Sequence, residues 1–150
     1  KDELLEQEFD VVRQLGDDLP LLLTDAKYLK QALLNVIKNA VEAIQEQGRI
    51  RIRTSQSAAG DVVNDIMDNG KGIPEDHMGK IFEPYFTTRK FGTGLGLVIV
   101  YKVVKEFGGE IKVKSEEGVG TTFTITLPVF EKKSKLLTYE EKHEGQSVNR

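Results

Sequence analysis

Apolar residues recur at three- and four-residue spacing between about Asp25 and Gln47, the period that places side chains on one side of a helix. They are Leu29, Ala32, Leu33, Val36, Ile37, Ala40, Val41 and Ile44. Thr24 or Asp25 can cap the first turn, and Gly48 follows the last one. The pattern therefore predicts an amphipathic helix over this stretch.

Two further stretches have helical spacing. Leu95 to Phe107 carries apolar residues on one side and precedes Gly108-Gly109, which suits a helix end. A short helical piece is predicted from Glu75 to Ile81. It lies within Asp68 to Gly94, a segment rich in Gly, Pro, Thr and charge that is otherwise typical of a loop. A loop of this length inside a compact domain usually carries function.

Alternation of apolar and polar residues, with turn residues between the runs, predicts six strands. They are Phe9–Leu15, Leu21–Thr24, Ile50–Thr54, Val62–Met67, Ile111–Ser115 and Thr121–Leu127. Short turns at 58–61 and 116–120 predict antiparallel hairpins. Because helices and hairpins alternate without strict βαβ order, we expect an α+β fold, with a mixed, mainly antiparallel sheet and the helices packed on one face.

The composition indicates one ordinary globular domain. The 150 residues are 39% hydrophobic and 30% charged, and they include no cysteine, which excludes disulfides and thiolate metal sites. The net charge of −3 lacks the basic excess of a nucleic-acid binder, so we expect no nucleic-acid partner. No apolar run reaches the ~18 residues that span a bilayer. We therefore expect no membrane insertion and a cytoplasmic location, with any membrane anchor elsewhere in a parent protein.

Four polar residues share one side of the first helix: Asn35, Lys38, Asn39 and Glu42, at positions i, i+3, i+4 and i+7. Such a stripe is often only a solvated face. Amide oxygens are, however, suitable ligands for Mg²⁺, which combines a few protein oxygens with water and substrate phosphates.

Two glycine motifs border the long loop. Asp68-Asn69-Gly70-Lys71-Gly72-Ile73-Pro74 follows a strand, where a carboxylate can accept a hydrogen bond from a base and glycines permit close approach. Alone, it is equally typical of a turn. Gly92-Thr93-Gly94-Leu95-Gly96-Leu97 opens the second helix, whose free N–H groups suit phosphate oxygens. Its spacing matches neither the dinucleotide fingerprint nor the P-loop.

The segment between the two motifs, Ile81 to Lys90, combines aromatic side chains with Arg89 and Lys90. The aromatic residues either anchor a lid or pin a long loop to the core, and both roles are compatible. The two cations suit the charge of a phosphate.

Taken in order, four motifs resemble the four boxes of the catalytic, ATP-binding domain of sensor histidine kinases. They are Asn35-Val36-Ile37-Lys38-Asn39-Ala40, Asp68-Asn69-Gly70-Lys71-Gly72, Phe82-Glu83-Pro84-Tyr85-Phe86 and Gly92-Thr93-Gly94-Leu95-Gly96-Leu97. The resemblance runs from roughly Asp10 to Pro128. It implies a two-layer α/β sandwich with about three helices on one face of the sheet and a long ATP lid. It also implies a catalytic domain over 1–128, with 1–8 as the end of a linker, and a charged tail over 129–150.

The resemblance implies that the chain binds ATP and Mg²⁺. Asn39 would coordinate the metal, with Asn35, Lys38 and Glu42 completing the catalytic set, and Asp68 would accept a hydrogen bond from the adenine amino group. The remaining nucleotide contacts would come from Gly70, Gly72, Ile73, Phe82, Thr87, Thr88, Arg89, Lys90, Gly92, Thr93, Gly94, Leu95, Gly96 and Leu97.

The implied activity is transfer of the γ-phosphate to a histidine on a separate dimerisation and phosphotransfer domain, and indirectly to a response regulator. His77 lies in the approach to the lid and His143 in the tail, so neither is a good acceptor candidate. Asn64 departs from the resemblance, because an apolar residue is usual there. A bulge or an altered register is one explanation.

Two alternatives belong to other functional classes. Related ATPases of topoisomerases, mismatch-repair proteins and heat-shock chaperones hydrolyse ATP with a glutamate four residues before the metal-binding asparagine. That position is Asn35 here, which favours transfer over hydrolysis. The second alternative is an interaction module that changes shape on binding ATP and transfers nothing.

Overall fold

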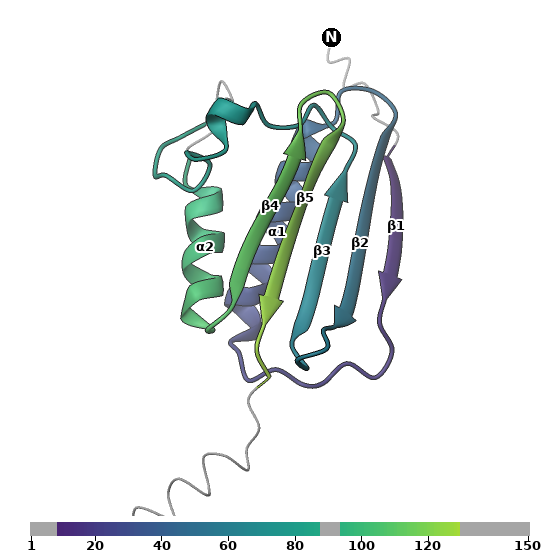
Figure 1. The fold of residues 1–150 in the computed structure, drawn as a ribbon, viewed down its shortest axis with the longest axis vertical. Helices are drawn as coiled ribbons and strands as arrows, with labels where there is room; N and C mark the ends of the chain where they lie inside the picture. Colours follow the sequence, from purple (N-terminus) through teal and green to yellow (C-terminus); the bar gives the residue numbers. More distant parts are fainter. Residues whose placement is uncertain (1–8, 88–93, 130–150) are drawn as a thin grey trace, which may run out of the picture.

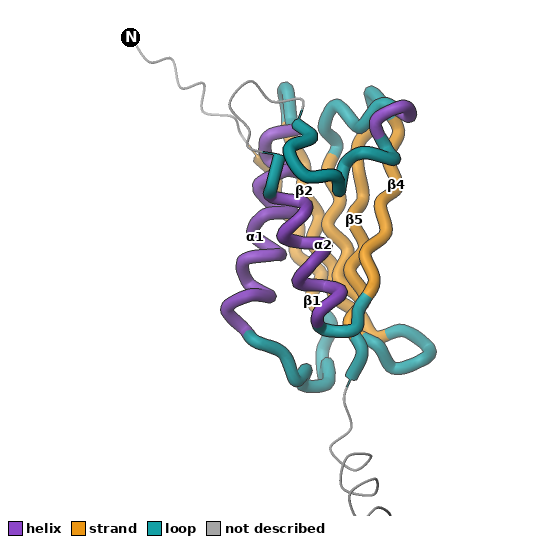
Figure 2. Tube along the Cα trace, turned by 90° about the vertical axis from the view of Figure 1, so that its left-hand side faces the viewer, coloured by secondary structure: helices purple, strands orange, loops and turns teal. Residues whose placement is uncertain are grey.

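The structure, a computed structural model, describes residues 9–87 and 94–129. Its elements are β1 (Phe9–Leu15), α1 (Ala26–Ala43), β2 (Gly48–Gln56), β3 (Val62–Asp68), the 3₁₀ helix η1 (Glu75–His77), α2 (Gly96–Glu106), β4 (Glu110–Glu116) and β5 (Gly120–Leu127). The strands of this described part form a five-stranded sheet in the order β1-β2-β3-β5-β4. Helices α1 and α2 lie side by side on one face of it (Figure 1, Figure 2).

The sheet is mixed and mainly antiparallel, which confirms the prediction. β1 runs parallel to β2, whereas the three other neighbouring pairs are antiparallel. β3 and β5 are adjacent although the long loop, α2 and β4 separate them in the sequence. The register places Asp68, at the end of β3, opposite Thr121, at the start of β5. The start of the long loop, at Asp68, is thereby tied to the centre of the sheet.

The core lies between the helix pair and the sheet. The predicted apolar side of α1 is confirmed, because its buried members are Ala32, Val36, Ala40 and, just after the helix, Ile44. They pack with Val100 and Val104 of α2 and with the strand residues Ile50, Ile66, Phe123, Ile125 and Leu127. Asp25 is the N-cap of α1, and its side chain accepts a hydrogen bond from the Lys27 N–H at 3.0 Å.

The predicted strand Leu21–Thr24 is wrong. The segment between β1 and α1 runs along the ends of the strands toward the start of α1, and it pairs with no described strand (Figure 1). Because β1 and β2 are parallel, the chain needs this crossing to return through α1 to the other end of the sheet. The crossing leaves Leu21 92% exposed and Leu23 64% exposed.

The helix boundaries also differ from the prediction. α1 ends at Ala43 rather than near Gln47, since Ile44 adopts extended backbone angles and its N–H bonds the Val41 carbonyl. The helical piece predicted from Glu75 to Ile81 is only the single 3₁₀ turn η1, followed by further turns. The described residues thus contain two α-helices and one short 3₁₀ helix. None of the described helices could span a bilayer.

The expectation of a bulge at Asn64 is wrong. Asn64 pairs in register with Thr54 of β2 and with Ile125 of β5, as do its neighbours on β3. Its side-chain Nδ2 donates to the Ile125 carbonyl at 3.4 Å, so the polar group is satisfied without a change of register.

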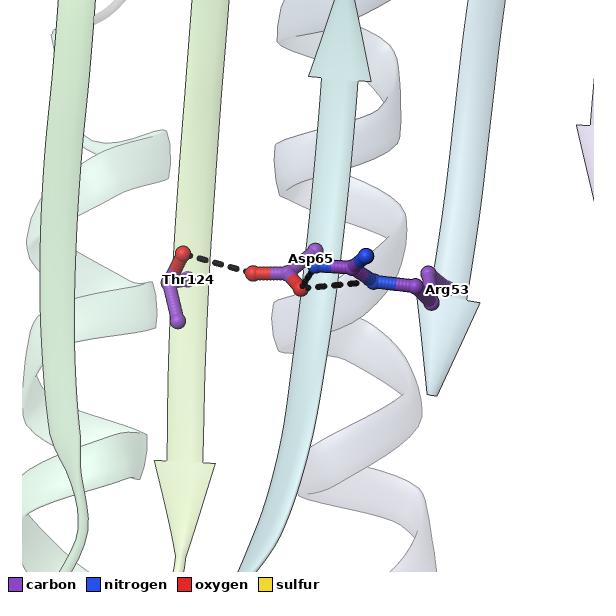
Figure 3. A network of polar contacts seen from close by, with 3 residues as sticks. All are labelled: Arg53, Asp65 and Thr124. Atoms are coloured by element: carbon purple, nitrogen blue, oxygen red, sulfur yellow. Dashed lines mark hydrogen bonds and ion pairs between the residues drawn. The ribbon is translucent and has the colours of Figure 1, made fainter. Parts of the chain in front are cut away.

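An ion pair and a hydrogen bond together join three strands on the sheet face that the helices leave open. The Asp65 side chain accepts hydrogen bonds from Arg53 Nε at 3.1 Å and Nη2 at 2.8 Å, and from the Thr124 hydroxyl at 2.7 Å (Figure 3). The three residues lie opposite one another on β2, β3 and β5. Asp65 is only 7% exposed, so these bonds satisfy a carboxylate that water reaches poorly.

We expect Asp65→Ala to lower the free energy of unfolding by about 1–3 kcal/mol, because bonds to a largely buried charge are lost. Urea denaturation measures the change. Lys112→Ala is the matched control, since Lys112 is exposed and lies opposite Thr124 in the same row. Its effect should stay within about 0.5 kcal/mol. Equal losses in the two variants would contradict a stabilising role for the ion pair.

Candidate functional site

A cavity of about 1060 Å³ lies among α1, the start of α2, the long loop and the ends of β3 and β5. Its volume is close to the upper limit that is usual for small-molecule sites. The sequence-predicted residues that line it are Asn35, Lys38, Asn39, Glu42, Asp68, Gly72, Ile73, Thr87, Gly94, Leu95, Gly96 and Leu97. The fold therefore gathers three separate motifs around one space.

Two further predicted site residues, Gly70 and Phe82, lie elsewhere in the described part of the chain. Gly70 borders a smaller neighbouring hollow rather than the main cavity. Phe82 packs against the core, and its ring centroid lies 5.6 Å from that of Tyr101. Thr88, Arg89, Lys90, Gly92 and Thr93 fall outside the residues that the structure describes.

Asp68 forms one end of the cavity. Its Oδ1 accepts a hydrogen bond from the Gly70 N–H at 2.8 Å, and the Thr121 backbone also bonds the carboxylate. Desolvation by burial nevertheless raises the pKa of the Asp68 carboxyl above its ordinary value, because it outweighs the opposing effect of these two hydrogen bonds. A partly desolvated carboxylate is well suited to accept a hydrogen bond from a ligand N–H group.

The hairpin of β4 and β5 supplies a wall of the cavity that the sequence analysis missed. Thr121 lines the cavity and is buried. The Ser115 hydroxyl accepts from the Ile73 N–H at 2.8 Å, donates to the Gly120 carbonyl at 3.1 Å and lies 2.8 Å from the Thr121 hydroxyl. Because Ser115 has one hydroxyl proton, Thr121 is the donor between the two side chains. The available signal was a pair of hydroxyls at inward strand positions that otherwise hold apolar residues.

The N-terminus of α2 forms the other end. No side-chain hydrogen bond from a described residue caps this helix at Leu95, and Leu95, Gly96 and Leu97 line the cavity. The first N–H groups of an α-helix have no partner within the helix. Asn35 Nδ2 donates to the Gly96 carbonyl at 3.3 Å, which fixes the first residue of α2 against α1. The Tyr85 N–H donates to the Gly94 carbonyl at 3.0 Å. Gly94 has φ +69°, and an added Cβ would collide with the Tyr85 backbone.

Oxygen donors face the cavity from α1. Asn39 and Glu42 line it one turn apart, with Asn35 one turn earlier. Among the described residues, no group of three or more His, Cys, Asp or Glu side chains could hold a metal by itself. A set of amide oxygens and one carboxylate fits Mg²⁺ that takes its other ligands from phosphates and water.

The glycines after Asp68 are required by the packing of the protein itself. The Lys71 N–H donates to the Ala43 carbonyl at 2.9 Å. A Cβ added at Gly70 would lie 2.6 Å from that same carbonyl oxygen. Gly72 has φ +71°, and its added Cβ would collide with the carbonyl of Glu116. These contacts, rather than approach of a ligand ring alone, explain why both positions are glycine.

Gly70→Ala and Gly72→Ala should each lower the free energy of unfolding by about 1–3 kcal/mol, because backbone atoms must move to admit a methyl group. Gly79→Ala is the control, since nothing lies within 4 Å of a Cβ added there. It should be neutral or slightly stabilising. The stabilities of the three variants are measured by urea denaturation. Equal stabilities would contradict the packing role.

Asp68→Asn tests the burial of the carboxylate. A raised pKa in the folded state means that the native protein binds a proton more tightly than the unfolded chain. The carboxylate therefore destabilises the fold as pH rises through the window between its unfolded and folded pKa values. We expect Asp68→Asn to be more stable than wild type at pH 7.5, with a smaller difference at pH 4. Urea denaturation at both pH values measures this, and a pH-independent difference would contradict it.

Comparison with known proteins gives a consistent result. Residues 24–131 match the family described as histidine kinase-, DNA gyrase B-, and HSP90-like ATPase. The chain is 48% identical over 114 residues to the sensor histidine kinase ZraS of Escherichia coli strain K12. That match covers 76% of the chain and 24% of ZraS, so the chain spans about a quarter of this relative.

Solved structures are similar in fold over most of the chain. The catalytic domain of histidine kinase ThkA is 35% identical with a TM-score of 0.70, and the match covers 80% of the chain and 78% of that domain. Full-length ShkA in complex with AMPPNP is 32% identical with a TM-score of 0.70, over 80% of the chain and 25% of ShkA.

Proposed function

The chain belongs to the histidine kinase-, DNA gyrase B-, and HSP90-like ATPase family, among its histidine-kinase catalytic domains, and we propose that it transfers the γ-phosphate of Mg·ATP to a histidine. The acceptor would lie on the dimerisation and phosphotransfer domain of the same kinase, and a response regulator would receive the phosphoryl group from there. ShkA, a relative with the same fold, has been solved in complex with AMPPNP.

One observation carries this proposal: a single cavity joins a desolvated carboxylate to the N-terminus of a helix. Asp68 would accept a hydrogen bond from the adenine amino group, beside Gly72 and Ile73. Phosphate oxygens would meet the first N–H groups of α2 near Gly96, where the helix dipole is positive. The two ends thus suit the two ends of a nucleotide.

The residues of α1 would bind the metal and the phosphates. Mg²⁺ bound with ATP supplies neutralisation of charge on the transferred phosphoryl group. Asn39 would be its main protein ligand, with Glu42 and Asn35 nearby, and Lys38 would meet phosphate charge. Arg89, Lys90 and Thr93, which lie outside the described residues, are proposed as further phosphate contacts on the strength of their motifs.

The contact made by Asn35 favours transfer over hydrolysis. Hydrolysis needs a base that activates water, and a carboxylate at this position would provide one. Asn35 is a neutral amide, and its Nδ2 is already bonded to the Gly96 carbonyl. Its role would therefore be to position α2, while the nucleophile comes from the acceptor domain.

The acceptor domain would dock beside the lid. Three apolar side chains at or near the start of α2 are exposed. They are Tyr85 at 77%, whose N–H bonds the Gly94 carbonyl, Tyr101 of α2 at 42%, and Leu95, which lines the cavity, at 37%. Exposed apolar groups that gather in one region are typical of protein contacts. We assign this region to the histidine-bearing domain because it adjoins the proposed phosphate end.

The decisive experiment combines the chain, γ-labelled ATP, Mg²⁺ and a separately purified dimerisation domain of the same kinase. Acid-labile, alkali-stable label on that domain would support phosphoryl transfer to histidine. Phosphate release without label on the acceptor would favour the hydrolytic alternative instead. Binding of ATP with neither reaction would favour an interaction module.

Asn39→Ala tests the metal assignment. We expect the affinity for ATP in the presence of Mg²⁺ to fall by roughly 10- to 100-fold, because a metal ligand is lost. Without Mg²⁺, wild type and variant should bind ATP with similar affinity. Isothermal titration calorimetry measures both constants, and Lys30→Ala, an exposed position of α1 away from the cavity, is the control. Equal losses with and without the metal would contradict coordination by Asn39.

A further inference from the structure

A buried polar atom in the loop has no partner. Nδ1 of His77, in η1, is buried and makes no hydrogen bond with any described residue. Buried polar side-chain atoms in folded proteins are nearly always paired, so an exception calls for a physical explanation. His77 also lines the main cavity, so a ligand bound there would contact this residue, and Nδ1 would bond the ligand once the ring turns toward it.

In the sequence, His77 lies between the two ends of the cavity, Asp68 and the start of α2. On one side, its backbone N–H donates to the Pro74 carbonyl at 2.9 Å, close in sequence to the segment that follows Asp68. On the other side, its ring meets Phe86 edge-on, with centroids 5.4 Å apart. The backbone of Phe86 is a close neighbour of Gly94, just before α2. Ile73 and Phe86, on either side of His77 in the sequence, line the cavity as well, so His77 belongs to the loop wall that runs between its two ends.

We propose that Nδ1 of His77 hydrogen-bonds a ribose hydroxyl of the bound nucleotide. In a nucleotide that extends from Asp68 to α2, the ribose is the part between the base and the phosphates. A hydroxyl can donate or accept, and so can a nitrogen of neutral imidazole, depending on its tautomer. The two groups are thus compatible in either tautomer. This inference rests on the proposed function, because it requires ATP in the cavity.

His77→Phe separates this role from simple packing. Phenylalanine keeps an aromatic ring against Phe86 but carries no nitrogen. The affinities of the chain for Mg·ATP, 2′-deoxy-ATP and 3′-deoxy-ATP, measured by isothermal titration calorimetry, distinguish the two roles. Wild type should bind one of the two deoxynucleotides about three- to tenfold more weakly than ATP. This is the loss of affinity expected when one neutral hydrogen bond is missing.

The variant should lose that discrimination. His77→Phe should bind ATP more weakly than wild type by the same factor. It should bind the deoxynucleotide that wild type binds weakly with the same affinity as wild type. Asp76→Asn, a change at the exposed neighbouring position in η1, should behave as wild type. If His77→Phe does not fold, as judged by thermal melting, His77→Leu replaces it.

Other outcomes overturn the inference. Equal wild-type affinities for the three nucleotides would exclude a bond to either hydroxyl, with no variant needed. An equal loss for all three nucleotides in His77→Phe would assign the ring to packing against Phe86. Failure of wild type to bind any nucleotide would overturn the proposed function as well, so the two failures are distinguishable.

Discussion

The site depends on how the backbone passes from β3 into the long loop. Between Asp68 and Gly72 the chain is in contact with the end of α1 on one side and the β4–β5 turn on the other. The Lys71 N–H bonds the Ala43 carbonyl, and the Lys71 carbonyl accepts from the Gly118 N–H at 2.8 Å. A side chain at Gly70 or Gly72 would collide with these walls. The passage is therefore narrow, and it fixes where Asp68 points.

Asn69 strengthens the same passage. Its Oδ1 accepts from the Arg49 N–H at 2.7 Å, and its Nδ2 donates to the Gln47 carbonyl at 3.2 Å. One side chain thus connects the loop to the start of β2. At the other end of the cavity, Asn35 connects α1 to the first residue of α2. Because α1 and the sheet hold both ends of the cavity, regular elements set the distance between these ends. The intervening loop can therefore change its conformation without moving them.

The sequence predicted those parts of the protein that follow from local periodicity. The apolar side of α1, the hairpins and the stripe from Asn35 to Glu42 all follow from spacing along one element. The strand Leu21–Thr24 could not be excluded in this way, because its failure to pair depends on the parallel relation of β1 and β2. Ser115 and Thr121 were missed for a similar reason. The bonds of Ser115 with Ile73 and of the Thr121 backbone with Asp68 depend on the adjacency of β3 and β5, which no local pattern encodes.

Several polar groups around the cavity lack a full set of hydrogen-bond partners among the described residues. Burial raises the pKa of Asp68, Nδ1 of His77 has no partner among the described residues, and no described side chain caps α2. Each of these features lowers stability, because a desolvated polar group loses hydration without a full replacement. They are concentrated around one cavity, whereas Asp65 on the opposite face is fully bonded. A ligand that completes these bonds would bind the folded state alone, and its binding energy would add to the stability of the fold. A rigid frame therefore holds polar groups whose hydrogen bonds a ligand in the cavity would complete.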